Sequence, residues 1–225
     1  MERTESVRPA ILMDGEPYVL HPSKIVCLLR SYAAHAKELN NAVPDRPRFF
    51  LKPPSSLLGN GGTIIIPEGV GSVHHEVELA VIIGKPGRMI PEESAADHVL
   101  GYTTMLDLTA RDLQDEAKSK GLPWTEAKGF DTFAPVGPSG ARSPSYDWRG
   151  KRVFLKVNGD IRQDGNTDLM IFTIEQMVSR ISQVMTFEDG DIIMTGTPAG
   201  VGPLKHGDRI EASVEGLGVL KARVG

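Results

Sequence analysis

The chain has 225 residues, which fits one large domain or two small ones. Its apolar share of 40%, charged share of 24% and net charge of −4 are ordinary for a soluble globular protein, and the absence of a Lys/Arg block argues against nucleic-acid or membrane-surface binding. The lone Cys27 excludes an internal disulfide and a cysteine zinc cluster, no apolar run is long enough for a membrane helix, and we therefore expect a cytoplasmic protein.

The predicted elements are mostly short strands, because glycine and proline are spread along the whole chain. A small hairpin is expected around Asp14-Gly15, and residues 41–62 read as irregular. Strands are expected at 25–29, 63–66, 75–83, 99–105 and 153–157, the last opening a hairpin at Asn158-Gly159, with further short strands and glycine-rich turns in 191–224. Helices are expected at 32–39, 109–120 and 173–185.

Two of the helices carry end signals. Thr109 with Asp112 suggests a capped start for the helix at 109–120, and Gly121 fits its end. Thr173 and Gln176 form a capping box ahead of an apolar face made by Ile174, Met177, Val178, Ile181 and Val184 or Met185. The pattern as a whole predicts an α+β, β-dominated domain with few short helices.

A pair of carboxylates stands out on the strand predicted at 75–83. Glu76 and Glu78 are two residues apart, so they point to the same face of a strand, while Val77 and Leu79 point to the other. Two carboxylates on a half-buried face repel each other, and a hard divalent cation such as Mg²⁺, Mn²⁺ or Ca²⁺ relieves that repulsion. Asp107 follows the strand predicted at 99–105 and could be a third ligand. The residues alone also allow a solvated strand face for the pair and a helix N-cap for Asp107.

Five separated motifs, in the expected order, resemble the fumarylacetoacetate hydrolase family from Lys24 to Val224. They are His75-Glu76-Val77-Glu78-Leu79-Ala80, Asp107-Leu108-Thr109-Ala110-Arg111-Asp112-Leu113-Gln114, Lys128-Gly129-Phe130-Asp131-Thr132-Phe133-Ala134-Pro135-Val136-Gly137-Pro138, the hairpin Asn158-Gly159 with Gln163, Gly165, Asn166 and Thr167, and Gly196-Thr197-Pro198-Ala199-Gly200-Val201-Gly202-Pro203. The resemblance implies the mixed β-roll fold of the family's C-terminal domain, a homodimer, and Mg²⁺ or Mn²⁺ held by Glu76, Glu78 and Asp107, with Ca²⁺ as a substitute in crystals. Residues 1–24 are then a short leader, and residues 25–225 are a single catalytic domain.

A histidine and a glutamate share one face of the helix predicted at 32–39. His35 and Glu38 are at i and i+3, and a carboxylate beside an imidazole fixes its tautomer and raises its basicity, which suits a general base. A surface His–Glu pair is the alternative from the residues alone. The segment resembles the family's mobile lid with its His–Glu dyad. It departs from the family at Leu29 and Ser31, beside Arg30, where members often have glycine and asparagine, so the resemblance leaves the local turn and its substrate contacts open but keeps the dyad.

The resemblance also implies roles for residues outside the lid. Lys128 matches the active-site lysine, which would stabilise developing negative charge, although a solvated loop lysine is the alternative. Arg30, Gln114 and Thr197 match substrate-binding positions. Arg111 is open to a structural ion pair with Asp112 or Asp115, and the remaining histidines singled out are read as structural, namely His74, His75 and His98.

The expected activity is metal-dependent chemistry on a small 2-oxo or diketo acid through a metal-bound enolate. Hydrolytic C–C cleavage of an acylpyruvate ranks first, with a water deprotonated by His35. Decarboxylation or tautomerisation of oxaloacetate ranks second, and isomerase or hydratase action on 2-hydroxy-2,4-dienedioates in aromatic catabolism ranks third. A metal-binding interaction protein without catalysis is the alternative from another class. No dinucleotide fingerprint and no Gly-x-Ser-x-Gly motif is present.

Overall fold

The computed structural model describes residues 8–38, 42 and 44–225. The α-helices in this part of the chain are short: α1 (Ala33–Glu38), α2 (Arg111–Lys120), α3 (Thr125–Lys128) and α4 (Ile174–Ser182). Short 3-10 helices lie at Pro54–Ser56, Glu92–His98 and Thr167–Leu169. Strands dominate the remainder, which confirms the predicted α+β, β-dominated class. No helix among the described residues is long and apolar enough to cross a membrane.

The largest sheet has nine strands and is mixed in direction. Eight of them follow the order β2 (Glu16–Val19), β1 (Ala10–Met13), β11 (Ala134–Arg142), β9 (Val99–Leu106), β8 (Val77–Ile83), β14 (Ile192–Met194), β3 (Ile25–Leu28) and β4 (Phe49–Lys52), and β5 (Leu57–Leu58) also pairs with β11. The pairs β1–β11 and β14–β3 are parallel, whereas β8 is antiparallel to both of its neighbours.

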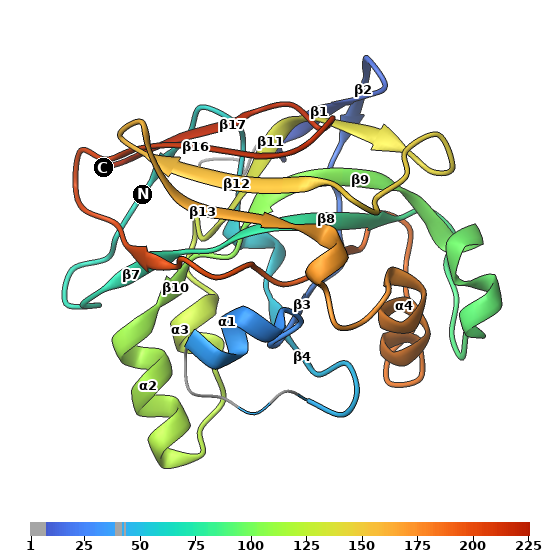
Figure 1. Cartoon of the computed structure of the whole chain (residues 1–225), viewed down its shortest axis with the longest axis horizontal. Helices are drawn as coiled ribbons and strands as arrows, with labels where there is room; N and C mark the ends of the chain where they lie inside the picture. Colours follow the sequence, from blue (N-terminus) through green and yellow to red (C-terminus); the bar gives the residue numbers. More distant parts are fainter. Residues whose placement is uncertain (1–7, 39–41, 43) are drawn as a thin grey trace, which may run out of the picture.

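A second sheet of five strands lies over the first. Its order is β13 (Asp160–Asn166), β12 (Arg152–Val157), β16 (Arg209–Val214), β17 (Leu220–Val224) and β6 (Thr63–Ile64). A small third sheet joins β10 (Thr109–Ala110), β7 (Val73–His75) and β15 (Gly202–Pro203). In Figure 1, β16 and β17 run above β8 and β9, while α1, α2 and α3 gather below them.

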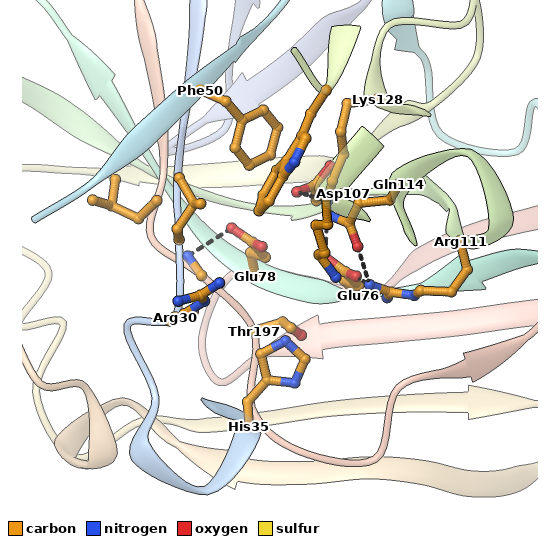
Figure 2. Close-up of a pocket in the computed structure, with 15 residues that line it drawn as sticks. Arg30, His35, Phe50, Glu76, Glu78, Asp107, Arg111, Gln114, Lys128 and Thr197 are labelled. Atoms are coloured by element: carbon orange, nitrogen blue, oxygen red, sulfur yellow. Dashed lines mark hydrogen bonds and ion pairs between the residues drawn. The ribbon is translucent and has the colours of Figure 1, made fainter. Parts of the chain in front are cut away.

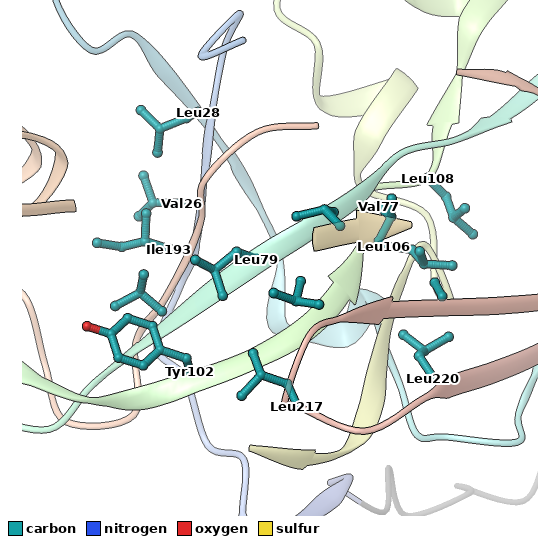
Figure 3. Packing of buried hydrophobic residues seen from close by; sticks show 14 of the residues in the cluster. Val26, Leu28, Val77, Leu79, Tyr102, Leu106, Leu108, Ile193, Leu217 and Leu220 are labelled. Atoms are coloured by element: carbon teal, nitrogen blue, oxygen red, sulfur yellow. The ribbon is translucent and has the colours of Figure 1, made fainter. Parts of the chain in front are cut away.

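The fold has two apolar cores, one on each face of the large sheet. Along β8, Leu79, Val81 and Ile83 join the larger core, which packs between the two main sheets (Figure 3). Ala80 and Ile82 point the other way, into a smaller core that takes side chains from β1, β3, β9, β11 and β14. Strands from distant positions in the sheet order share this smaller core, so the sheet must curve around it. This curvature is the mixed β-roll that the family resemblance implied.

The N-terminal hairpin forms where the sequence placed it. Asp14 and Gly15 both adopt positive φ, 51° and 89°, as a tight two-residue hairpin turn requires. Strand β1 then pairs in parallel with β11, with Leu12 opposite Ser139, so part of the segment predicted as a leader belongs to the large sheet. The stretch predicted as irregular, 41–62, holds β4 and β5. These strands are difficult to predict from the sequence because they are short and lie beside prolines and glycines.

One predicted helix cap is wrong. Helix α2 begins at Arg111, its N-cap is Ala110, and no side chain caps it. The Thr109 hydroxyl donates instead to the carbonyl oxygen of Asp107, two residues before it, and the Asp112 carboxylate accepts from the Ser72 backbone N–H, a tertiary contact. Asp107 is not the helix cap either, because the N-cap position falls on Ala110. Gly121 ends the helix with φ 66°, as predicted.

The capping box of α4 is confirmed, and it supports a stability prediction. Thr173 Oγ1 accepts from the Gln176 N–H at 3.2 Å, and Gln176 Oε1 accepts from the Thr173 N–H at 3.1 Å. Thr173→Ala removes the first of these bonds, so we expect the free energy of unfolding to fall by about 1 kcal/mol. Urea denaturation followed by circular dichroism measures this change. The exposed Thr186→Ala is the matched control, and an equal loss in both variants would contradict the capping role.

Candidate metal centre and active site

Three buried carboxylates converge at one end of the smaller core. Glu78 lies on β8 and shares its face with Ala80, Asp107 directly follows β9, and Glu76 occupies the break between β7 and β8. One carboxylate oxygen from each residue lies within 4.8 Å of the other two, and the three residues are at most 5% exposed. The predicted shared face of Glu76 and Glu78 is therefore confirmed, and the reading as a solvated strand face is wrong.

The single strand predicted at 75–83 is interrupted at Glu76 for a structural reason. The Glu76 carbonyl oxygen accepts from the Asp107 N–H at 2.8 Å. The next N–H, that of Val77, donates to the Gln163 side chain rather than to a neighbouring strand. The backbone at Glu76 thus serves the contacts that bring the carboxylates together instead of continuing the ladder.

The charges of the cluster differ from one carboxylate to another. Burial raises the pKa of Glu78, and the nearby charges of Asp107 and Glu76 raise it further, while the Gly196 N–H at 2.7 Å offsets only part of this. For Glu76 burial also opposes ionisation, but Lys128 and Arg111 outweigh it and hold the pKa below its ordinary value. The protein therefore balances the charge of Glu78 less well than that of Glu76.

The donor set fits a hard divalent cation. All three candidate ligands offer carboxylate oxygens, the ligand type that Mg²⁺ and Mn²⁺ prefer. Asp107 Oδ1 is buried and lies 2.9 Å from Lys52 Nζ, yet it accepts no properly aligned hydrogen bond. A cation would use this oxygen and would neutralise the repulsion at Glu78. These observations support Glu76, Glu78 and Asp107 as a metal site.

Lys128 lies against the carboxylates, as the sequence predicted. Its Nζ donates to Asp107 Oδ2 at 2.6 Å and to Glu76 Oε2 at 3.1 Å, and the residue is 2% exposed. Burial opposes the charge of the amine, but Asp107 and Glu76 outweigh burial and raise the pKa of Lys128. The alternative of a solvated loop lysine is therefore wrong, and Lys128 brings a fixed positive charge to the site.

Two further cations at the site were missed or misread from the sequence. Lys52 is fully buried at the end of β4, where its Nζ donates to the carbonyl oxygens of Leu108 at 2.9 Å and Lys128 at 2.5 Å besides pairing with Asp107. Its sequence context, an apolar strand before a proline, carries no signal of such a role. Arg111 was open to a structural ion pair on its own helix, but its guanidinium contacts Glu76 and donates to Gln114 Oε1 at 2.6 Å.

The predicted dyad also forms. His35 Nδ1 lies 3.1 Å from Glu38 Oε2 within α1, which leaves Nε2 as the ring nitrogen free of this pair. The other oxygen, Glu38 Oε1, accepts from the Gly200 N–H at 3.0 Å and so ties α1 to the glycine-rich loop. Figure 2 shows His35 and Thr197 on one side of the three carboxylates, opposite Lys128 and Phe50.

A small cavity of about 40 Å³ connects these groups. It is lined by every residue predicted for the site except Glu38, which contacts His35. The lining adds residues that were not predicted for the site, namely Leu28, Leu29, Phe50, Arg111, Lys118, Trp124 and Gly196. Arg30 reaches the cavity from a left-handed backbone conformation with φ 55°, beside the departures at Leu29 and Ser31.

Thr197 and Gln114 lie at the cavity with some of their polar atoms already engaged. The Thr197 hydroxyl donates to the Val77 carbonyl oxygen at 2.8 Å and accepts from Gln163 Nε2 at 2.7 Å. Its proton is therefore committed, and only an acceptor site remains for a ligand. Gln114 Oε1 accepts from Arg111, so the Gln114 amide group faces the cavity in a fixed orientation.

The raised pKa of Glu78 leads to a prediction about metal binding. A protonated Glu78 must release its proton to become a ligand, so metal affinity should rise with pH. We expect the Mn²⁺ affinity to increase by up to about tenfold per pH unit until the raised pKa is passed, and then to level off. Titration of free Mn²⁺ by electron paramagnetic resonance at several pH values measures this trend. An affinity that is flat from about pH 5 to about pH 8 would contradict it.

Comparison with known proteins identifies the family. A family model described as "Fumarylacetoacetate (FAA) hydrolase C-terminal" matches residues 24–225. The chain belongs to this family. It is 53% identical over 195 residues to the mitochondrial oxaloacetate tautomerase of Arabidopsis thaliana, covering 87% of each chain. It is 50% identical over 195 residues to the mitochondrial oxaloacetate decarboxylase of Dictyostelium discoideum, covering 86% of this chain and 89% of the other.

A solved structure in the fumarylacetoacetate hydrolase family has nearly the same fold. Fumarylpyruvate hydrolase from Pseudomonas aeruginosa, in complex with Mn²⁺ and pyruvate, aligns with a TM-score of 0.91 at 33% identity, covering 100% of this chain and 98% of the other. This relative holds a divalent cation, and the buried acidic cluster described above could bind one in this chain. The relatives named for an activity are enzymes of small oxo acids, which supports the prediction of an enzyme.

Proposed function

We propose that this protein is a divalent-metal-dependent enzyme that acts on oxaloacetate, a four-carbon 2-oxo acid. It either interconverts the keto and enol forms of oxaloacetate or decarboxylates it. The carrying observation is the group of three buried carboxylates, Glu76, Glu78 and Asp107, within 4.8 Å of one another and with Lys128 against two of them. Relatives at 53% and 50% identity, named oxaloacetate tautomerase and oxaloacetate decarboxylase, favour oxaloacetate as the substrate. This choice reverses the ranking drawn from the sequence, where acylpyruvate hydrolysis stood first.

The roles proposed for the residues follow from their positions. Mg²⁺ or Mn²⁺ held by the three carboxylates would polarise the 2-oxo group of the substrate as a Lewis acid. Lys128, held as a cation by Asp107 and Glu76, would stabilise negative charge that develops on the substrate oxygen. His35, with Nδ1 fixed by Glu38, would exchange a proton through Nε2 with the substrate carbon next to the carbonyl.

The remaining cationic and amide groups would bind the substrate's carboxylates. Arg30, Arg111 and Gln114 line the cavity and are donors of the kind that carboxylates accept. A cavity of about 40 Å³ holds an ion and a few water molecules, so a four-carbon acid requires side chains at the mouth to move. Arg30 and Lys118 are the long side chains among the lining residues that could do so.

Acylpyruvate hydrolysis is the second candidate. The fumarylpyruvate hydrolase structure, which covers the whole of this chain, favours it. The same residues would serve, except that His35 would deprotonate water instead of a substrate carbon. Both reactions pass through negative charge on the 2-oxo group, so the metal site and Lys128 do not discriminate between them. The substrate-facing surface near His35 decides which proton is moved.

A substrate panel tests the proposal. Purified protein is supplied with Mn²⁺, Mg²⁺ or EDTA, and ultraviolet absorbance follows the enol form of oxaloacetate and the loss of acetylpyruvate and fumarylpyruvate. Lactate dehydrogenase with NADH separately reports pyruvate from decarboxylation. We expect metal-dependent acceleration with oxaloacetate that EDTA removes. Turnover of acylpyruvates alone would select the second candidate, and bound metal without turnover of any substrate would favour a non-catalytic interaction protein.

A further inference from the structure

Gln163 is a buried residue that the catalytic proposal does not use. It lies on β13 in the hairpin with β12, where the pairing shifts: Gln163 faces Leu155, but Ile161 already faces Lys156. The two residues before it, Ile161 and Arg162, are both exposed, whereas Gln163 is 0% exposed. A bulge of this kind redirects side chains, and here it turns the Gln163 amide into the protein.

Every polar group of this amide is engaged. Gln163 Oε1 accepts from the Val77 N–H at 3.1 Å and from His75 Nδ1 at 2.9 Å. Gln163 Nε2 donates to Thr197 Oγ1 at 2.7 Å and to the Pro198 carbonyl oxygen at 2.9 Å. Val77 N–H can only donate and the Pro198 carbonyl can only accept, so these two partners fix the orientation of the amide. His75 must then carry its proton on Nδ1.

These bonds close a ring around the backbone between two proposed metal ligands. Val77 separates Glu76 from Glu78, and Gln163 holds its N–H. The Thr197 hydroxyl holds the carbonyl oxygen of the same residue at 2.8 Å, and Gln163 in turn holds Thr197. Gln163 therefore adds to the bonds that fix both glutamates relative to the glycine-rich loop 196–202, beside the Gly196 N–H, which donates to Glu78 at 2.7 Å.

Two glycines allow the hairpin and the loop to approach this closely. A Cβ on Gly165 would lie 2.6 Å from Pro198 Cβ, and a Cβ on Gly200 would lie 2.2 Å from the Arg162 carbonyl oxygen. Gly200 also has φ 98°, which side chains other than glycine rarely adopt. The β12–β13 hairpin therefore packs directly against loop 196–202, which carries Thr197 and whose Gly200 N–H donates to Glu38.

We propose that Gln163 is a positioning residue: it locks the strand segment carrying Glu76 and Glu78 to the loop carrying Thr197, so that metal ligands and substrate loop keep one fixed relation. It hydrogen-bonds to none of the three carboxylates and does not line the cavity, and it acts through Val77 and Thr197. Groups of this kind around a metal site alter affinity or activity by about 10–100-fold. The effect expected through Thr197 concerns substrate binding and rests on the proposed function. The effect expected through Val77 concerns metal binding alone and does not rest on it.

Two variants separate the contact with Val77 from the contact with the glycine-rich loop. Gln163→Glu keeps an acceptor for Val77 and His75 but loses both donors to the loop. We expect its Mn²⁺ dissociation constant to stay within about threefold of wild type, while pyruvate binding to the Mn²⁺-loaded protein and KM for oxaloacetate weaken by about tenfold. Gln163→Leu loses the acceptor for Val77 as well as the donors to the loop, and we expect Mn²⁺ binding itself to weaken by about tenfold. Electron paramagnetic resonance measures free Mn²⁺, and calorimetry measures pyruvate binding.

A double-mutant cycle distinguishes positioning from a general loss of stability. Thr197→Val removes the Gln163–Thr197 hydrogen bond from the other side. The losses of pyruvate affinity in Gln163→Glu and Thr197→Val should therefore not be additive, and the double variant should bind pyruvate within about threefold of the weaker single variant. Gln183→Glu, on the exposed end of α4, makes the same chemical change far from the loop and should leave all three measurements unchanged. Mn²⁺ stoichiometry corrects each value for the folded fraction.

The outcomes are separable. Additive losses in the cycle, or an Mn²⁺ affinity of Gln163→Leu equal to that of wild type, would overturn the positioning role. If Gln163→Glu does not fold, Gln163→Leu decides the matter through its Mn²⁺ affinity. A wild-type protein that binds Mn²⁺ and pyruvate but turns over no oxo acid would refute the proposed function alone, because neither titration needs catalysis.

Discussion

Glu78→Gln is expected to lose tight Mn²⁺ binding and turnover while the metal-free protein stays at least as stable as wild type. Glutamine keeps the shape of the side chain but removes the charge that a divalent cation needs, and we expect Mn²⁺ affinity to fall by about 100-fold or more. The metal-free wild type, by contrast, holds this carboxylate in a buried site beside Asp107 and Glu76, which raises its pKa. Removing that carboxylate removes repulsion.

The sign of the stability change depends on pH. A carboxyl group whose folded pKa is raised contributes stability that is present below its ordinary pKa and is lost as the pH rises through the raised value. The neutral glutamine has no such loss. In EDTA the stability advantage of Glu78→Gln over wild type should therefore grow as the pH rises from about 4.5 through the raised pKa.

Thermal or urea unfolding with and without Mn²⁺ measures the difference in stability between Glu78→Gln and wild type. At an Mn²⁺ concentration of about 100 times its dissociation constant, wild type should gain about 2.7 kcal/mol and the variant almost nothing. Glu116→Gln is the matched control, because Glu116 pairs with Lys120 on the exposed face of α2. A Glu78→Gln protein that keeps Mn²⁺ affinity, or that is markedly less stable than wild type in EDTA, would contradict the assignment of Glu78.

His35→Ala is expected to lower kcat by about 10²–10⁴ while leaving the Mn²⁺ dissociation constant unchanged. The imidazole is proposed to move a proton, and its described hydrogen-bond partner is Glu38 rather than a carboxylate of the metal site. The pH profile of kcat should lose the limb that reports the general base. Stopped assays with Mn²⁺-saturated protein across a pH series measure both effects.

Two companion variants sharpen this test. Glu38→Gln keeps an acceptor for His35 but removes the negative charge, so the loss in kcat should be smaller than that of His35→Ala. His206→Ala removes an exposed histidine on the turn before β16 and should leave kcat unchanged. Full activity of His35→Ala would exclude the proton-transfer role, and a joint loss of Mn²⁺ binding would assign His35 to the metal site instead.

Local patterns in the sequence predicted those parts of the structure that local physics determines. The two-residue period of a strand put Glu76 and Glu78 on one face, the capping box set the start of α4, and Asn158-Gly159 marked the hairpin between β12 and β13. Each of these depends on neighbours within a few residues. The ordered motifs then predicted the β-roll and the family, which the fold and the family match confirm.

Contacts between distant segments were decided only by the tertiary structure. Lys52 donates to a carbonyl 56 residues away, and Gln163 donates to a threonine hydroxyl 34 residues away. Arg111 turned from its helical neighbours to Glu76, and β1 joined the large sheet in parallel with β11. Local periodicity predicts which side of an element is apolar. It does not predict which polar group from another element will contact a buried charge. The three carboxylates and Lys128 could therefore be predicted from the sequence, whereas the contacts of Lys52, Arg111 and Gln163 were decided only by the folded chain.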